Sequence, residues 1–506
     1  MWIPPCAEAS NVGSSLTVGI QSVKTMEIRP LDPLERDIQS IYRLIYEPLV
    51  YIDDEYMPQP CLAESWIPTG NGRTWTFNIR RGVTFSDGSP MTASDVVATA
   101  NYILERAKDE VSAVKGYYSN LKYFIDRITA TDDHTVVVRA ASGRTGYGLL
   151  YAMTFPILPE TEVSQINPLG TGPYILSDFD PTNAIYLDAN PNWWKSMPTV
   201  QEINFVCHNT QQAVMESYEY GRVKTIFTRS IAAAQYKSGS SSLSLDYRTN
   251  QLEVLLMNQS YNKLKSLKVR QAIMHAVDPD YIASHAYYGM VHRTDTPMIA
   301  GTWMYNDAAA AEFYYDPELS RQLLVEDGWG DSNEDGILDK LGEDEQVLEL
   351  KLRLLVYEEP DNDVRFAAAA IIQEELAAIG IEVEIVTETY NGALTKLGAG
   401  SFHLALCSFA MDVCPDPGFM LMSGNTGNYG RYRSSAMGDL FKKLRTSEQY
   451  GPYRDTLMEI QQQYADDCPF VCLFYRGGTV LTRLMYTTAR DVRELELLRG
   501  IESFRP

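Results

Sequence analysis

The stretch VLELKLRLLVYEEPDNDVRFAAAAIIQEELAAIGIEVEI, residues 347–385, predicts the fold of the chain. In residues 347–356, leucines alternate with charged side chains at a period of two, as in a strand with one buried face. After a proline break, residues 364–379 carry apolar side chains at helical spacing, and Gly380 supplies a C-terminal cap. In residues 381–385, apolar side chains again alternate with acidic ones. Strand, helix and strand in this order form a βαβ unit, so we expect a parallel strand pair in an α/β domain.

Other local signals agree with this reading. Thr92 followed by Asp95 predicts a helix start, and Asp316 before Pro317 predicts another. The segment GTGPY, residues 170–174, lacks the lysine of a phosphate-binding loop and precedes an expected strand. We therefore expect its glycines to let the backbone pass close to a neighbouring strand.

Length and composition limit the class of the protein. A chain of 506 residues exceeds what one hydrophobic core organises, which predicts two or three domains. Acidic side chains outnumber basic ones, 66 to 43, and the formal charge of −23 would repel nucleic acid and anionic lipid surfaces. No run of about 18 uncharged apolar residues occurs, so we expect no membrane-spanning helix.

The N-terminal segment has features of a processed export signal. Ala7-Glu8-Ala9 has the small-x-small form of a signal-peptidase site and precedes a polar linker. We interpret residues 1–9 as the stub of a trimmed signal and expect an exported protein at the cell surface or in the periplasm. A cytosolic tail is the alternative. Cys6 is a candidate for lipid attachment, although Pro4 and Pro5 stand where a lipoprotein signal has small residues.

The sequence lacks the motifs of common enzymes. Its six histidines never show the spacing of H-E-x-x-H, and neither a G-x-S-x-G nor a P-loop segment occurs. Seven cysteines without a C-x-x-C pair argue against a zinc ribbon and leave the disulfide pairing open. These absences favour a binding protein that requires no cofactor over an enzyme, although catalytic triads also assemble from distant segments.

Several segments match a known family in the family's order along the chain. They are EPLVYIDDEYMPQPCLAESW (47–66), TWTFNIRRGVTFSDGSPMTASDVV (74–97), PLGTGPYIL (168–176), NPNWW (190–194), SLKVRQAIMHAVDPDYI (266–282) and MDVCPDPGFML (411–421). Together they resemble family 5 of the extracellular solute-binding proteins, the receptors of oligopeptide, dipeptide and nickel ABC importers.

The resemblance implies an α/β fold of the type II periplasmic-binding-protein kind, with two lobes, a hinged cleft and an extra inserted α+β domain. Lobe I would comprise residues 10–45, 168–262 and 474–506, the inserted domain residues 46–167, and lobe II residues 263–473. The crossing segments would lie near Met257–Asn262 and Phe474–Arg476. Such a protein acts as a monomeric receptor that holds a solute between its lobes and delivers it to the membrane permease.

The resemblance also implies an anchor for the ligand. Peptide-binding members pair an aspartate with the ligand's amino terminus in the segment that here reads FAMDVCPDP, where Asp412 matches best and Asp416 is the second candidate. A carboxylate in a closed cleft needs a cationic partner, because burying it unpaired is costly. The alternative is that Asp412 only caps a turn.

Dipeptide-binding members hold the ligand carboxylate with an arginine in the segment that here reads LVYEEPDND. Glu358 and Glu359 occupy that segment and cannot pair with a carboxylate when ionised. We therefore expect a longer peptide, a polyamine-like cation or a sugar, and sparse histidines argue against nickel. Trp303, Tyr429 and Tyr432 are candidates to stack on the ligand. The alternatives are a solvated loop for the glutamates and plain packing for the aromatic residues.

An acidic loop matches part of a calcium-binding pattern. Asp331, Asn333, Asp335 and Asp339 stand at oxygen-ligand positions around a central glycine, but Gly342 replaces the expected bidentate glutamate. The loop is a candidate site for a structural calcium ion, and an acidic surface turn is the alternative.

A solute-binding receptor is the function that we expect. A chaperone-like or adhesive surface protein on the same fold, and an extracellular hydrolase, are the alternatives. Binding of unfolded chains would indicate the first alternative, and turnover of chromogenic peptides would indicate the second.

Overall fold

The computed structural model describes residues 15–22, 28–32, 36–108, 118–180, 184–236, 242–342, 346–359, 363–484 and 492–503. The chain forms two compact units, with boundaries between Thr249 and Asn250 and between Arg476 and Gly477. We call them unit 1, which precedes the first boundary and follows the second, and unit 2, residues 250–476. Unit 2 therefore begins earlier and ends later in the chain than the expected lobe II, 263–473. The expected signal stub, residues 1–9 with Cys6, lies outside the described residues.

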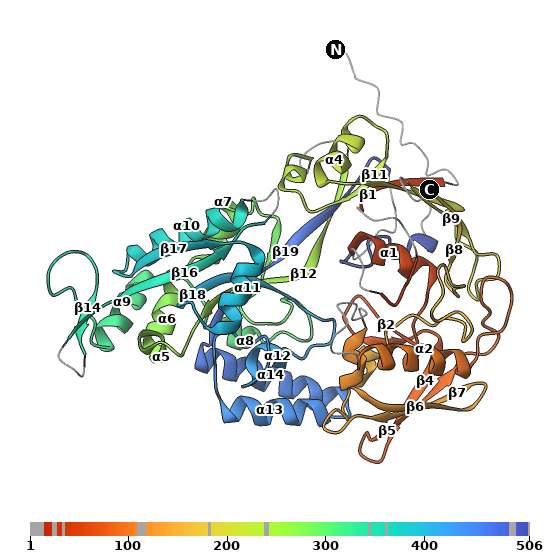
Figure 1. Ribbon diagram of the computed structural model, residues 1–506, viewed down its shortest axis with the longest axis horizontal. Coiled ribbons are helices and arrows are strands. Elements are labelled where there is room, and N and C mark those ends of the chain that lie inside the picture. The colour runs from red at the N-terminus through yellow and green to blue at the C-terminus, as the bar shows by residue number, and fades with distance from the viewer. Residues whose placement is uncertain are drawn as a thin grey trace, which may run out of the picture. The chain divides into compact units, whose positions relative to one another are not determined.

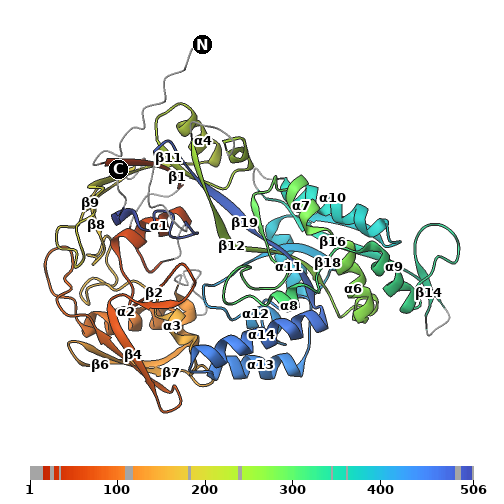
Figure 2. The same cartoon turned by 180° about the vertical axis from the view of Figure 1, so that it is seen from behind.

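Both unit boundaries fall inside long strands, β12 (Leu243–Met257) and β19 (Phe470–Thr482). The two strands are hydrogen-bonded neighbours, and both views show them side by side (Figures 1 and 2). The side chains of β12 are mostly half-buried at first and are continuously buried from Leu252 onward. A continuous buried run is typical of a strand covered on both faces, so β12 enters the core of unit 2 well before its end at Met257.

The main sheet of unit 1 is mixed. It begins with the unit 1 parts of β12 and β19 and continues, in spatial order, with β11 (Thr225–Thr228), β1 (Ser15–Gln21), β10 (Glu202–His208), β9 (Ala184–Ala189) and β8 (Tyr174–Asp180). β1 is parallel to both of its neighbours, whereas β10, β9 and β8 are successively antiparallel. The helices α1 (Arg36–Ile45) and α4 (Gln211–Glu219) pack on this sheet.

Residues 46–167, the expected inserted domain, lie within unit 1 and form a second sheet there (Figure 1). Its strands are β4 (Ala63–Thr69), β5 (Thr74–Ile79), β7 (Thr135–Ala140) and β6 (Ile125–Asp132), and α2 (Ala93–Arg106) packs on β6 and β7. The hairpin of β2 (Val50–Ile52) and β3 (Pro58–Pro60) and the short α3 (Leu149–Ala152) complete this region. The predicted helix start is confirmed, since the Thr92 amide donates to Asp95 at 2.8 Å.

Unit 2 contains the predicted βαβ unit. Parallel β16 (Lys351–Tyr357) and β17 (Glu382–Glu388) are joined by α10 (Val364–Ala377), and Gly380 adopts a positive φ of 85° after the helix. The expected single strand 347–356 is two strands, because β15 (Val347–Glu349) pairs with β14 (Asp339–Leu341) instead of joining the main sheet. As a result, Leu348 is 37% exposed, whereas Leu350 is buried.

The remaining elements of unit 2 surround this parallel core. They are α5 (Asn262–Lys265), α6 (Leu267–Ala276), α7 (Pro279–His285), β13 (Val291–Arg293), α8 (Asp307–Ala310), α9 (Pro317–Glu326), α11 (Tyr390–Ala399), β18 (Leu404–Ala410), α12 (Gly418–Leu421), α13 (Ser435–Thr446) and α14 (Tyr450–Asp467). The start of α9 is capped by Asp316, as predicted. Within the described ranges, none of the helices combines the length and apolar character that a bilayer crossing requires.

The glycines of GTGPY allow a close backbone contact in unit 1. A Cβ on Gly170 would lie 2.1 Å from the carbonyl oxygen of Ile45, and one on Gly172 would lie 2.6 Å from that of Leu44. The Gly172 amide donates to the Ile45 carbonyl at 2.9 Å and so satisfies one free acceptor at the end of α1. The close approach was predicted, but its partner is the end of a helix and not a strand.

We therefore expect Gly170→Ala to destabilise the protein by about 1–3 kcal/mol or more, because the backbone carbonyl that the new methyl group would meet cannot move aside easily. Chemical denaturation followed by tryptophan fluorescence measures this effect. Gly438→Ala in α13 is the matched control, since nothing lies within 4 Å of its Cβ position. That control should be neutral or stabilising by up to about 1 kcal/mol. Equal stabilities of the two variants would contradict the account of this contact.

Candidate functional site

The sheet of unit 2 has a switch point in its topology. β16 lies between β17 and β18 and is parallel to both. From the end of β16 the chain continues to β17, which lies on one side of β16 in the sheet. From the end of β18 it continues to β19, which lies on the opposite side, beyond β12. In open α/β sheets, ligands bind outside the carboxyl ends of strands at such a point. We call the residues at these strand ends, 357–359 and 409–412, the carboxyl edge of unit 2.

Four charged side chains form a buried ion-pair quartet at this edge: Glu253, Arg365, Glu359 and Arg476. Glu253 Oε1 lies 2.8 Å from Arg365 Nη2 and 2.5 Å from Arg476 Nε. Glu359 bridges the same two arginines, at 3.0 Å and 2.8 Å. The side chains of Glu253 and Arg365 have no exposed surface. The quartet therefore balances two positive and two negative charges inside unit 2.

The surroundings of the quartet keep its charges in place. Burial alone would raise the pKa of Glu253, but the guanidinium groups of Arg365 and Arg476 outweigh it and hold that pKa below its usual value. The Arg365 guanidinium also lies 3.9 Å from the centre of the Tyr357 ring, within the range of a cation–π contact. Glu253 is therefore a carboxylate at neutral pH, and the quartet is ionic.

This arrangement separates the two glutamates of LVYEEPDND. Glu359 is committed to Arg365 and Arg476. Glu358 is exposed, and its amide extends the pairing with β17 by donating to the Glu388 carbonyl at 3.0 Å. Of the two, only Glu358 presents its carboxylate on an exposed side chain, so a contact of Glu359 with the ligand would require the quartet to rearrange.

Aromatic side chains gather at the carboxyl edge. The Phe409 ring stacks on Tyr429 with centroids 6.0 Å apart, and it also contacts Phe419. The Tyr357 ring meets Tyr390, the first residue of α11, edge-to-face at 5.4 Å. Tyr390 is 55% exposed. The edge thus offers aromatic surface next to acidic groups, and Tyr429 is part of it.

The two candidate anchor aspartates differ in their surroundings. Asp412 follows β18 by two residues, is exposed, and accepts a hydrogen bond from the Cys414 amide at 3.2 Å. Asp416 forms a bidentate ion pair with Arg445, whose Nε and Nη2 lie 2.7 Å and 3.0 Å from the two carboxylate oxygens. The Asp416 side chain is only 7% exposed. Asp416 is therefore committed to Arg445, and the side chain of Asp412 is exposed at the edge.

The other two aromatic candidates lie in different surroundings. Tyr432 is buried, and its hydroxyl donates to Asp467 at the end of α14. The Asn428 side-chain amide donates to the Tyr432 carbonyl at 2.7 Å, and a ligand contact of Tyr432 stays a prediction. Trp303 is half-buried and contacts Tyr450 of α14, with ring centroids 5.1 Å apart. A ligand contact of Trp303 stays a prediction.

The acidic loop of unit 2 uses many of its oxygens internally. Asp331 accepts from the amides of Asp335 and Gly336, Asn333 bonds Asp335, and Asp339 accepts from Ser332. In the part of the chain that the structure describes, no three acidic, histidine or cysteine side chains are grouped to hold a metal ion. Gly336 has the positive φ of 86° that the sharp turn requires. Calcium binding by this loop stays a prediction.

Sequence reasoning did not anticipate Glu253, Arg365 and Arg476. Arg365 and Arg476 lie 112 and 223 positions after Glu253 in the chain, and only the tertiary structure brings the three side chains together. Each was visible as a lone charge inside an apolar run: QLEVLLM, VRFAAAAII and FVCLFYRGG. Because ionised groups are rarely buried without partners, a lone charge in a buried element signals a hidden ion pair.

Comparisons with known proteins agree with this fold. The sequence model of the bacterial extracellular solute-binding proteins, family 5, matches residues 57–431. The oligopeptide-binding protein AppA of Bacillus subtilis is 24% identical over 96% of this chain and 91% of its own. The nickel-binding periplasmic protein of Escherichia coli is 25% identical over 71% of this chain and 69% of its own. The solved structure of B. subtilis AppA with a nonapeptide matches with a TM-score of 0.69 and 20% identity, over 97% of this chain and 98% of the AppA chain.

The chain belongs to the bacterial extracellular solute-binding proteins of family 5. This confirms the expected family, the expected periplasmic-binding-protein type of α/β fold and the expected function, a solute-binding receptor of the ABC-transporter class. The family consists of binding proteins of transporters and not of enzymes.

We expect Arg365→Met to lower the free energy of unfolding by about 3–5 kcal/mol, because it removes the guanidinium that faces the buried carboxylate of Glu253. Arg353→Met is the matched control, since Arg353 is exposed on neighbouring β16. That control should change the stability by less than about 0.5 kcal/mol. Urea denaturation of both variants measures the difference. A loss below about 1 kcal/mol for Arg365→Met would contradict a charged, tightly paired quartet.

Proposed function

We propose that the protein captures a peptide or another small cationic or polar solute at the carboxyl edge of unit 2 and delivers it to an ABC-transporter permease. The observation that carries the proposal is the place of Asp412. Its side chain is exposed two residues beyond the end of β18, at the switch point of the sheet, and β18 also carries Phe409 of the aromatic cluster. An acidic group beside aromatic surface suits an ammonium group attached to an apolar body.

The charges of the edge favour the cationic end of a ligand. Both arginines of the quartet, Arg365 and Arg476, face the carboxylates of Glu253 and Glu359. A ligand carboxylate would have to compete with Glu359 for them, whereas Asp412 and Glu358 present acidic side chains on the surface. This arrangement supports an amino terminus or a polyamine-like group at the edge and argues against a free dipeptide carboxylate there.

Among the ligands named for the relatives, a peptide fits this chain better than nickel. The described residues hold no grouping of metal-ligating side chains. We further propose that the protein works as an exported monomer, with Cys6 as the candidate for membrane attachment.

A first experiment tests solute binding itself. In a thermal-shift screen of oligopeptides, polyamines and amino sugars, we expect at least one class to raise the melting temperature. At about 100 times its dissociation constant, a ligand adds roughly 2.7 kcal/mol of stability by mass action. No shift with any class, together with turnover of chromogenic peptides, would refute the receptor function. Mass spectrometry of the natively purified protein identifies which ligand it carries.

A second experiment tests the anchor. Asp412→Asn keeps the shape of the side chain and removes its charge, so it should weaken a cationic ligand by about 2–5 kcal/mol, or roughly thirtyfold and more. Calorimetric titration with the ligand found in the screen measures this loss. Folding should be unaffected, because Asp412 is exposed.

Two matched variants make the anchor test specific. Asp416→Asn should lower stability and leave affinity nearly unchanged, because it breaks the ion pair with Arg445. Asp439→Asn, on the exposed face of α13, should change neither quantity, since its side chain is 74% exposed. If Asp412→Asn binds within about twofold of the unmodified protein, Asp412 is not the anchor.

A further inference from the structure

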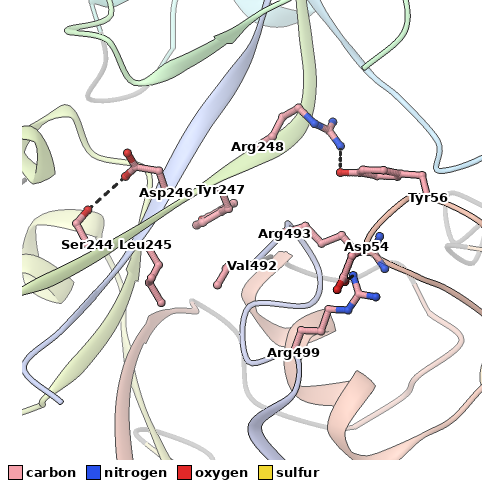
Figure 3. Close-up of a pocket in the computed structure, with 10 residues that line it drawn as sticks. All are labelled: Asp54, Tyr56, Ser244, Leu245, Asp246, Tyr247, Arg248, Val492, Arg493 and Arg499. Carbon is pink, nitrogen blue, oxygen red and sulfur yellow. Dashed lines mark hydrogen bonds and ion pairs between the residues drawn. The ribbon is translucent and has the colours of Figure 1, made fainter. Parts of the chain in front are cut away.

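Unit 1 contains a pocket of ≈ 340 Å³ that the proposed function does not use (Figure 3). The first half of β12, the tip of the β2–β3 hairpin and the segment that begins at residue 492 line it. Its charged and aromatic lining includes Asp54, Tyr56, Asp246, Arg248, Arg493 and Arg499. A volume of this size falls in the range of small-molecule sites.

Two arginines of the pocket flank one aromatic ring. The guanidinium carbons of Arg248 and Arg493 lie 5.3 Å and 5.4 Å from the centre of the Tyr56 ring, and Figure 3 shows Arg248 reaching the Tyr56 hydroxyl. Tyr56 adopts a φ of 61°, a left-handed conformation that favours glycine. Glycine would avoid this strain but could not hold two guanidinium groups, so the ring has a use at this position.

Neutral groups position the arginines that come from the C-terminal segment. Arg493 Nη1 donates to the Asp53 carbonyl at 3.0 Å, and Arg499 Nη2 donates to the Ile52 carbonyl at 3.0 Å. These hydrogen bonds fix the guanidinium groups on the hairpin without cancelling their charge. Glu496 neutralises one of the two, since it lies 2.8 Å from Arg493 and 3.7 Å from Arg499.

Asp54 supplies the second negative charge, at the surface of the pocket. Its Oδ1 lies 2.9 Å from Arg499 Nη1, and its side chain is 53% exposed. Such an exposed ion pair contributes little to stability, so another oxyanion can replace the Asp54 carboxylate at little cost. The other acidic side chain, Asp246, is exposed and accepts from the Ser244 hydroxyl at 3.3 Å.

We propose that this arginine pocket binds the carboxylate or phosphate group of a small organic anion, and that Asp54 occupies the place of that group when no anion is bound. Guanidinium forks match the oxygens of both groups, and three arginines converge here in a chain whose formal charge is −23. Elsewhere that charge would repel an anion, so its capture needs such a local grouping. The site is independent of the cation that Asp412 is proposed to hold.

The test is calorimetric titration of the full chain with citrate and with inorganic phosphate. Two substitutions should act in opposite directions. Arg248→Gln should weaken binding at least about tenfold, because it removes a charged donor. Asp54→Asn should strengthen binding about two- to fivefold, because it removes the competing carboxylate. Arg139→Gln is the control and should change nothing, since its side chain on β7 is 70% exposed and lies outside the pocket.

Binding of citrate alone supports a carboxylate ligand, and binding of phosphate alone supports a phosphate ligand. If neither anion binds the unmodified protein, or if Asp54→Asn leaves binding unchanged or weaker, the proposal is wrong. The result for Asp54→Asn tests the proposal even if Arg248→Gln folds poorly, because Asp54→Asn alters only an exposed side chain. Asp412→Asn should leave anion binding intact, so failure of the anchor would not count against this pocket.

Discussion

The ion pairs of Glu253 are the interaction on which the arrangement of unit 2 depends. This one carboxylate, without exposed surface, joins Arg365 at the start of α10 to Arg476 on β19. Glu359 then ties the end of β16 to the same two arginines. Removing any member would leave an uncompensated charge in a buried position. The strand ends of the carboxyl edge are thereby held in one arrangement, and the side chains that face solvent there are presented on a rigid base.

A second buried carboxylate, that of Glu47, joins separate segments of unit 1. Glu47 accepts hydrogen bonds from Trp194, Trp193 and Thr171, at 2.7, 3.3 and 3.1 Å. Burial raises the pKa of Glu47, although these donors and Lys195 oppose the shift. Glu47 and these three partners come from three of the segments that carry the family resemblance, EPLV, PLGTG and NPNWW. Those motifs identify the family because they are parts of one buried network, and for the same reason they say little about the ligand.

The groups available to a ligand lie outside these networks, and each unit carries a different kind. In unit 2 they are exposed carboxylates and aromatic rings at strand ends, whereas in unit 1 they are arginines that a hairpin and a C-terminal segment hold in place. Asp416 illustrates the distinction, because its partner Arg445 makes it part of the scaffold although it lies four residues from Asp412. Position in a motif therefore does not establish a role in binding.

The sequence by itself determined the βαβ unit, the helix starts at Thr92 and Asp316, the close approach of Gly170 and the family, because each rests on local periodicity, capping or motif order. Only the tertiary structure showed that Asp416 and Glu359 are neutralised by Arg445, Arg365 and Arg476. It also showed that Tyr432 is buried with its hydroxyl on Asp467, and it grouped three arginines from distant segments into one pocket. The reason is physical: secondary-structure propensity depends on near neighbours in the chain, whereas the partners that cancel a charge are set by the fold and lie 29 positions away for Asp416 and 112 and 223 positions away for Glu253.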